Sequence, residues 1–84
     1  MQSGNPIQAP AHAPAGGTVE VQVESSVSQV WVQLPGEDYV LMKVPKSGKV
    51  TLDVPNTPGE IIEVNVRRGG SVVGVSIVIV APTP

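Results

Sequence analysis

The amino-acid sequence alternates apolar and polar residues with a period of two over most of its length after residue 17. Residues 18–24 show this most clearly, with three valines separated by glutamate and glutamine. Successive side chains of a β-strand point to opposite faces of a sheet, so the alternation predicts strands with one buried and one solvated face. No segment sustains the period of an amphipathic helix. The sequence therefore predicts an all-β fold.

Glycine and proline residues interrupt the alternation at intervals typical of a β-sandwich or barrel. Between these interruptions the pattern predicts six strands, at residues 18–24, 28–35, 39–45, 49–54, 60–68 and 71–80. A further edge strand is predicted near residues 6–9, because proline is tolerated at the edge of a sheet. The predicted organisation is a Pro/Ala/Gly-rich arm at 1–17, a sandwich at 18–81 and a tail at 82–84.

Three loops can be tested against the alternation, because a slip of one residue would turn the apolar face of a strand outward. The first is the Gly-Gly pair at 69–70, a favoured two-residue hairpin sequence. The other two are three-residue loops at 36–38 and 46–48. Together they predict that these residues face one another: Val66 and Val73, Leu34 and Val40, and Val44 and Val50.

Composition excludes several classes of partner. The 84 residues carry a formal net charge of −2, and the five basic residues are scattered rather than clustered as nucleic-acid binding requires. The N-terminus lacks the pattern of a signal peptide, and the longest apolar run, 72–81, falls far short of the ~20 residues that span a bilayer. We expect a soluble chain that binds neither nucleic acid nor membranes.

The sequence offers no set of residues for catalysis or for a cofactor. Its one histidine, His12, lies between alanines in the arm, and no cysteine accompanies it, so a zinc site lacks its usual ligands. Glu37, Asp38 and Asp53 are the only acidic grouping considered for calcium, and ordinary surface charge explains them better. We predict that the protein is not an enzyme and holds no cofactor or metal.

Some apolar residues fall on faces that a solvated strand would keep polar. Trp31 lies between two glutamines on the outward phase of its strand, and strand 71–80 is apolar on both faces. Exposed tryptophan is enriched at binding hot spots, so these residues could form a binding surface. The alternative is that the second sheet or the arm covers them. The arm itself either docks through Ile7 or stays loose. The candidate partner-binding residues are Ile7, Trp31, Tyr39, Leu41, Val78 and Val80.

The order and spacing of these segments resemble bacterial and phage immunoglobulin-like domains. The resemblance is carried by the arm Pro-Ile-Gln-Ala-Pro, by Val-Trp-Val-Gln-Leu, and by the stretch from Gly48 to Val80. It implies an antiparallel immunoglobulin-like β-sandwich of about seven strands with an extended N-terminal arm. Many such domains place Pro-Gly-x-Tyr at the start of the strand that corresponds to residues 60–68, but here Ile61 replaces the tyrosine. The disulfide of antibody domains is also absent.

Two functional hypotheses follow. In the first, the protein is a decoration (cement) subunit of a bacteriophage-type virion, made in the host cytoplasm, that braces coat subunits or copies of itself. In the second, it is a spacer or carbohydrate-binding module of a secreted or cell-surface bacterial protein, in which Trp31 and Tyr39 stack on a sugar ring. Both hypotheses describe a binding protein without catalytic activity.

Overall fold

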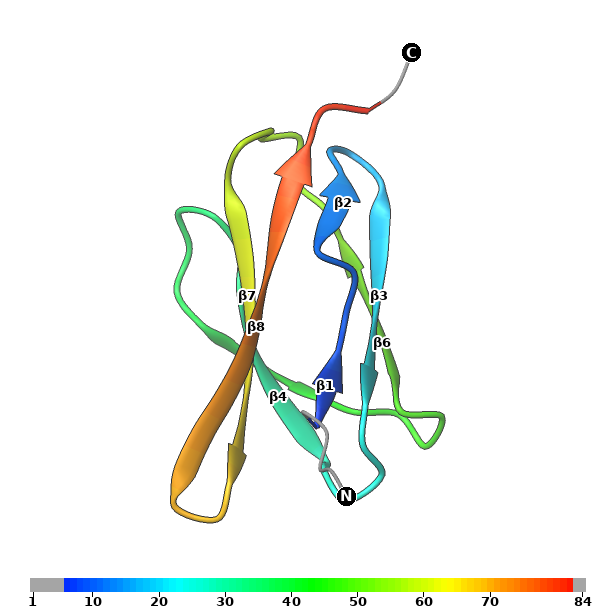
Figure 1. Ribbon diagram of the computed structural model, residues 1–84, viewed down its shortest axis with the longest axis vertical. Coiled ribbons are helices and arrows are strands. Elements are labelled where there is room, and N and C mark those ends of the chain that lie inside the picture. Colours follow the sequence, from blue (N-terminus) through cyan, green and yellow to red (C-terminus); the bar gives the residue numbers. More distant parts are fainter. Residues whose placement is uncertain (1–5, 83–84) are drawn as a thin grey trace.

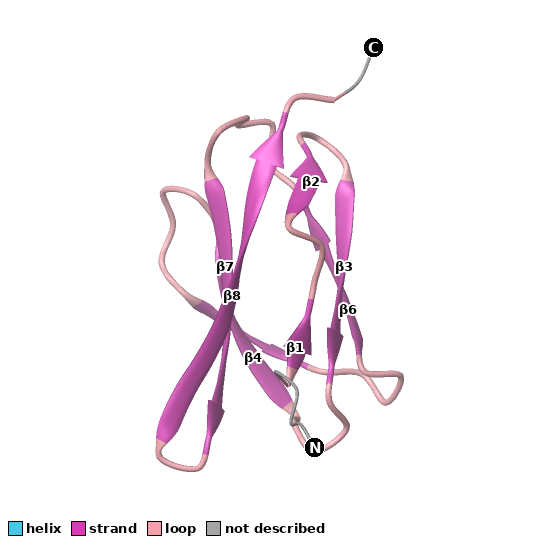
Figure 2. Ribbon diagram, in the orientation of Figure 1, coloured by secondary structure: helices cyan, strands magenta, loops and turns pink. Residues whose placement is uncertain are grey.

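The computed structural model describes residues 6–82, which form strands, turns and loops without a helix (Figure 2). The all-β prediction is confirmed. Residues 1–5 of the predicted arm and residues 83–84 of the predicted tail lie outside the described residues. The strands are β1 (Ile7–Gln8), β2 (His12–Pro14), β3 (Thr18–Val23), β4 (Gln29–Gln33), β5 (Val40–Lys43), β6 (Lys49–Asp53), β7 (Ile61–Arg68) and β8 (Ser71–Val80).

The strands form two sheets that pack on one another as a β-sandwich (Figure 1). One sheet has three strands in the order β1-β3-β6, and the other has five in the order β2-β8-β7-β4-β5. All pairs are antiparallel except β2 with β8, which is parallel. Because β1 and β2 belong to different sheets, the chain between them crosses from one layer to the other.

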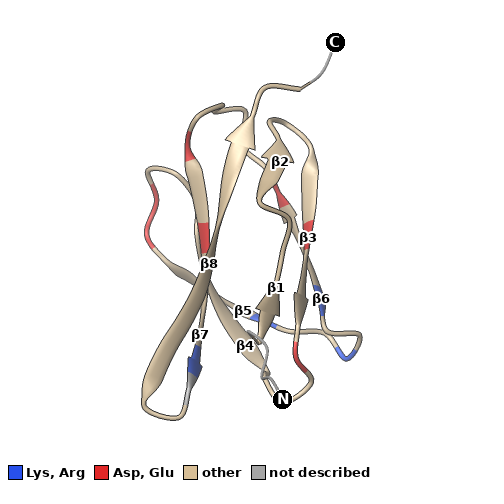
Figure 3. Cartoon of the chain, in the orientation of Figure 1, with Lys and Arg blue, Asp and Glu red and all other residues tan. Residues whose placement is uncertain are grey.

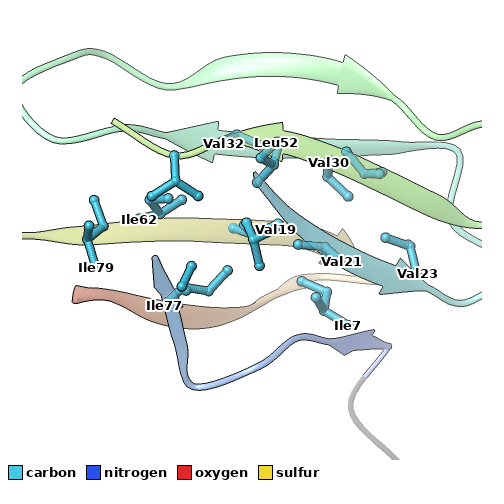
Figure 4. Close-up of a cluster of buried hydrophobic side chains, with 14 of the residues drawn as sticks. Ile7, Val19, Val21, Val23, Val30, Val32, Leu52, Ile62, Ile77 and Ile79 are labelled. Carbon is cyan, nitrogen blue, oxygen red and sulfur yellow. The ribbon is translucent and has the colours of Figure 1, made fainter. Parts of the chain in front are cut away.

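The core between the sheets consists of aliphatic side chains from both layers (Figure 4). Valine and isoleucine predominate, and these β-branched residues pack well on the pleated surface of a strand. Neither the single tryptophan nor the single tyrosine of the chain contributes to this core. The buried members are Ile7, Ala13, Ala15, Val19, Val21, Val23, Val30, Val32, Val50, Leu52, Val54, Ile62, Val64, Val66, Ile77 and Ile79.

Residues 6–17 belong to this sandwich. Ile7 is only 1% exposed and lies opposite Val23 in the β1–β3 pair, within the cluster shown in Figure 4. The edge strand predicted near residues 6–9 is thus present. The sequence did not predict β2, whose three residues pair with the end of β8 and have no apolar–polar alternation to signal a strand. The core therefore begins before residue 18, where the predicted sandwich began.

The hairpin between β7 and β8 has the predicted register. Val66 faces Val73, and the same register continues along both strands to Ile61 opposite Val78. At the turn, Gly69 has a φ of +61°. A positive φ at the first central residue is the requirement of a II′ hairpin turn, and glycine meets it without steric cost.

The other two predicted pairings are wrong. Val32, not Leu34, faces Val40, so the loop between β4 and β5 is longer than predicted. This shift of two residues keeps every side chain on its predicted face, and the alternation alone cannot detect it. Val44 and Val50 do not face one another, because β5 and β6 lie in different sheets. The loop that joins them crosses between the layers.

The unequal sheets leave β5 partly uncovered. Val40 points to the inner side, opposite buried Val32, yet it is 55% exposed. Met42, two residues further along the same side of β5, is half-buried. Since β5 is the edge strand of the wider sheet, the three-stranded sheet does not extend far enough to cover its inner side. A hollow of about 240 Å³ remains there, between β5 and β6.

If residues 6–17 are part of the core, replacing Ile7 with alanine must leave a cavity. We expect Ile7→Ala to lower the free energy of unfolding by about 2–4 kcal/mol, the usual cost of truncating a buried isoleucine. Gln8→Ala, at the exposed neighbouring position, should change it by less than about 0.5 kcal/mol. Urea denaturation followed by circular dichroism measures both. Equal stabilities of the two variants would show that β1 does not pack in solution.

Candidate binding surface

The solvent-facing side of the five-stranded sheet is called the outer face here. Strand pairing sets its side chains in rows that run across the sheet from β5 to β8. One row contains Leu41, Trp31, Asn65 and Gly74, and the next contains Gln33, Glu63 and Ser76. A third row, nearer the end of β8, contains Ile61, Val78 and His12. Residues far apart in the sequence thus become neighbours on one surface.

The aromatic end of the outer face is formed by Trp31, Tyr39, Leu41 and Val72. Their exposed fractions are 40%, 42%, 43% and 65%. Trp31, Tyr39 and Val72 surround a shallow hollow of about 200 Å³, which Asn65 and Arg67 complete. The outward orientation predicted for Trp31 is confirmed, and within residues 6–82 neither the opposite sheet nor the arm covers it.

A polar bridge fixes Tyr39 over the sheet. The Tyr39 hydroxyl donates to Glu63 Oε1 at 3.2 Å and accepts from Asn65 Nδ2 at 3.1 Å. Glu63 and Asn65 both lie on β7, whereas Tyr39 lies in the loop before β5. These bonds are exposed, so each adds only modestly to stability. Their main effect is geometric, because they hold the Tyr39 hydroxyl at β7 and so keep the side chain at the hollow that it shares with Trp31.

Gly74 makes this bridge possible. It lies opposite Asn65, and a Cβ atom at Gly74 would overlap Asn65 Oδ1 and come within 3.1 Å of the Val64 carbonyl oxygen. The absence of a side chain lets the Asn65 amide extend over β8 while its nitrogen reaches Tyr39. Asn65, Glu63 and Gly74 were not among the predicted site residues. The sequence could have indicated this contact, because the correctly predicted hairpin register pairs Asn65 with Gly74.

The remaining candidate residues lie elsewhere. Val80, 37% exposed, and half-buried Val78 lie on the outer face beyond the polar row of Gln33, Glu63 and Ser76, together with Ile61. They form a second apolar area separate from the aromatic end. Ile7 is in the core, where its side chain contacts the chain itself and is not presented to a partner. The structure thus brings together only three of the six predicted residues.

The residues considered for metal chemistry do not converge. Glu37, Asp38 and Asp53 flank the hollow between β5 and β6. Among residues 6–82, however, no three acidic, histidine or cysteine side chains are arranged to hold a metal ion. His12 is exposed on β2. The same part of the chain contains no helix long and apolar enough to cross a membrane.

No protein-family model matches the chain, and no curated protein or solved structure shows significant similarity to it. No relative therefore assigns a role to any residue of the outer face. The geometry of that face and the sequence itself are what support a functional proposal.

The contact between Gly74 and Asn65 can be tested with a double-mutant cycle. We expect Gly74→Ala to displace the Asn65 amide from Tyr39, because the new methyl group would overlap Asn65 Oδ1. In an Asn65→Ala background the same change should cost less, with a coupling energy of about 1 kcal/mol from urea unfolding. Gly70→Ala is the control, because nothing lies within 4 Å of a Cβ at Gly70. Equal coupling of Gly70 and Gly74 to Asn65 would contradict the contact.

Proposed function

We propose that this protein is a non-enzymatic binding subunit that contacts a protein partner through the aromatic end of its outer face. The observation that carries the proposal is that both aromatic residues of the chain are exposed, side by side, on one surface. Tryptophan and tyrosine bury more apolar area than other residues. A chain of this size has little core to spare, so placing both outside favours a role in binding.

The aromatic end has the composition of an interface centre. Trp31 and Leu41 are neighbours across β4 and β5, and Val72 lies across the hollow from them. Polar side chains, including Gln29 and Arg67, surround this apolar group. Interfaces commonly combine a desolvated apolar centre with a polar rim. Burying a fully exposed apolar side chain contributes about 1.5–3 kcal/mol, and these side chains, which are 40–65% exposed, would contribute roughly half of that each.

The polar bridge supports the same proposal through preorganisation. Tyr39 is held by Glu63 and Asn65 before any partner arrives. A side chain that is already oriented loses less conformational entropy on binding, so more of its contact energy remains as affinity. The bridge would serve no comparable purpose on a surface that only meets solvent.

The finer proposal is that the partner is a coat subunit of a bacteriophage-type capsid, which the protein would decorate and brace. A small sandwich that binds across assembled subunits stabilises the assembly by mass action, because it has no binding site on dissociated subunits. The support for this step is the resemblance described above and the small size of the chain.

The strand order supports the proposal that the sandwich is immunoglobulin-like. In that fold, strands A, B and E pair in one sheet, and strands G, F, C and C′ pair in the other. The sheets β1-β3-β6 and β8-β7-β4-β5 have the same order, with β2 added beside β8. The tyrosine corner and the disulfide are absent, so the likeness is one of topology.

A second candidate function is carbohydrate binding, and the hollow at the aromatic end favours it. Trp31 and Tyr39 offer ring faces there, while Asn65 and Arg67 offer hydrogen-bond donors. Small-ligand sites combine apolar and aromatic walls with a few placed polar groups in this way. The hollow, at about 200 Å³, is smaller than the roughly 300–1,000 Å³ of most small-ligand pockets.

If a coat-protein gene lies beside this gene, shells assembled from that coat protein test the protein-binding proposal. We expect Trp31→Ala to weaken cosedimentation with these shells at least about tenfold, the effect of removing a hot-spot residue. Thr51→Ala is the control, because Thr51 is exposed on β6 in the opposite sheet. Unchanged occupancy of the Trp31 variant would refute the proposed surface.

Truncation of the arm would not answer the same question. Removing residues 1–15 would also remove Ile7, Ala13 and Ala15 from the core, so lost binding could reflect lost folding. Substitutions on the outer face avoid this, because the exposed side chains there are not part of the core.

The carbohydrate alternative is tested on a glycan array. If the hollow binds a sugar, we expect the wild-type protein to bind a defined group of glycans, and both Trp31→Ala and Asn65→Ala to abolish this binding. Thr51→Ala should retain it. Binding that persists in the Trp31 variant would place the sugar elsewhere, and no binding by the wild type would exclude the array's glycans as partners.

A further inference from the structure

One edge of the five-stranded sheet is largely uncovered. Strand β8 pairs with β7 along residues 71–78, but on its other side β2 pairs only with residues 78–80 (Figure 1). Within residues 6–82, no strand pairs with β8 on that side between Ser71 and Ile77. The first strand of the chain does not pair with it, because β1 belongs to the other sheet.

The hydrogen-bond pattern shows which backbone groups this open edge presents. The Ile79 amide donates to the Glu60 carbonyl on the β7 side, whereas the Val78 amide donates to the Ala11 carbonyl on the β2 side. Amide and carbonyl groups alternate between the two sides of a strand. The register with β7 is continuous from 71 to 78, so the alternation holds throughout. Residues 72, 74 and 76 therefore direct their amide and carbonyl groups to the open edge.

The open edge lacks the features that usually prevent strand pairing between molecules, which are charged side chains, prolines and very short strands. Strand β8 contains no charged residue and no proline (Figure 3). The other sheet edges differ. Strands β1 and β2 have two and three residues, β5 ends in Lys43, and β6 has Lys49 and Asp53 at its ends. Among the strands within residues 6–82, β8 alone combines length, apolar side chains and a long stretch without a paired strand on one side.

We propose that this edge pairs with the same edge of a second copy of the chain, antiparallel and about a twofold axis at Gly74. Each copy offers three residues whose amide and carbonyl groups point to the open edge: Val72, Gly74 and Ser76. Pairing Gly74 with Gly74 of the second copy, and Val72 with Ser76 of the second copy, uses all three. If the twofold axis passed through residue 73 or 75 instead, one of these three residues would have no free edge-facing residue of the second copy opposite it. The geometry thus selects one register.

The side chains fit this register. On the inner side, Val73 meets Val75 of the second copy, and both valines are only half-buried in the single chain. On the outer side, Val72 meets Ser76 of the second copy. No like charges come together, because the segment from Ser71 to Val80 has none. A strand of another protein would need a matching length of uncharged residues, whereas a second copy supplies it with its own symmetry.

The pairing also joins the two outer faces. A twofold axis perpendicular to the sheet places both of them on the same side of a continuous sheet of ten strands. Two aromatic ends would then face the same way, and a partner with repeated sites could bind both at once. The dimer does not depend on the function proposed above, because it is held by backbone groups of β8, whereas the aromatic end acts through the side chains of Trp31, Tyr39 and Leu41. Val72 is the residue that belongs to both.

The first test compares self-association of Ser76→Pro and Ser76→Ala. Sedimentation equilibrium of the wild type should show a concentration-dependent mass rising toward twice the 8.7 kDa of the chain. Ser76→Pro removes the amide that points to the open edge and none of the hydrogen bonds to β7. It should therefore weaken the dimer at least about tenfold. Ser76→Ala keeps the amide and should leave the dissociation constant within about twofold. Circular dichroism should show that both variants fold.

The second test determines the register, and it is clean because the chain has no cysteine. In the proposed dimer, residue 73 lies directly opposite residue 75 of the second copy, within disulfide distance. Two residues numbered 73 lie on a diagonal at about 7–8 Å and cannot join. Mixing Val73→Cys and Val75→Cys chains under oxidising conditions should therefore give a disulfide dimer on a non-reducing gel, and each variant alone should give little.

Three results would overturn the proposal. They are a wild type that stays monomeric at millimolar concentration, a folded Ser76→Pro variant that associates as well as the wild type, and cysteine variants that cross-link equally well alone and mixed. A monomeric wild type would leave the edge to a strand of a different protein. None of these results bears on Trp31, so the surface proposed above would stand or fall separately.

Discussion

Burial of the valine and isoleucine faces between two sheets is the interaction on which the other features of this protein depend. Because side chains alternate along a strand, placing Val30 and Val32 in the core necessarily turns Trp31 outward. The same rule sets Val64 inside and Asn65 outside. The binding surface is thus a direct geometric consequence of the core. A shift of any strand by one residue would destroy both together.

The outer face then acquires order from contacts that the core does not require. Gly74 leaves room for Asn65, Asn65 and Glu63 hold Tyr39, and Tyr39 closes the hollow beside Trp31. These contacts link β5, β7 and β8 on the solvent side, where stability gains little from them. Their presence distinguishes the aromatic end from an ordinary solvated sheet, on which exposed residues make few long-range contacts.

The unequal width of the two sheets has a second set of consequences. Three strands cannot cover five, so β5 keeps Val40 exposed. Strand β8 has β7 on one side, but on its other side no strand of residues 6–82 pairs with it between Ser71 and Ile77. Residues 6–82 contain no further strand to close these gaps, and the short β2 covers only the end of β8. Association with another chain is one physical solution for an incompletely covered sandwich of this size.

The sequence by itself determined the all-β class, the approximate strands, the face on which each side chain lies and the β7–β8 hairpin, because these depend on local alternation and on a Gly-Gly turn. It also identified Trp31, Tyr39 and Leu41 as outward residues. Only the tertiary structure decided that β5 and β6 lie in different sheets, that Ile7 is buried, and that Asn65 and Gly74 complete the aromatic end. Those features depend on which strands become neighbours, and a period of two carries no information about neighbours or about register shifts of two residues.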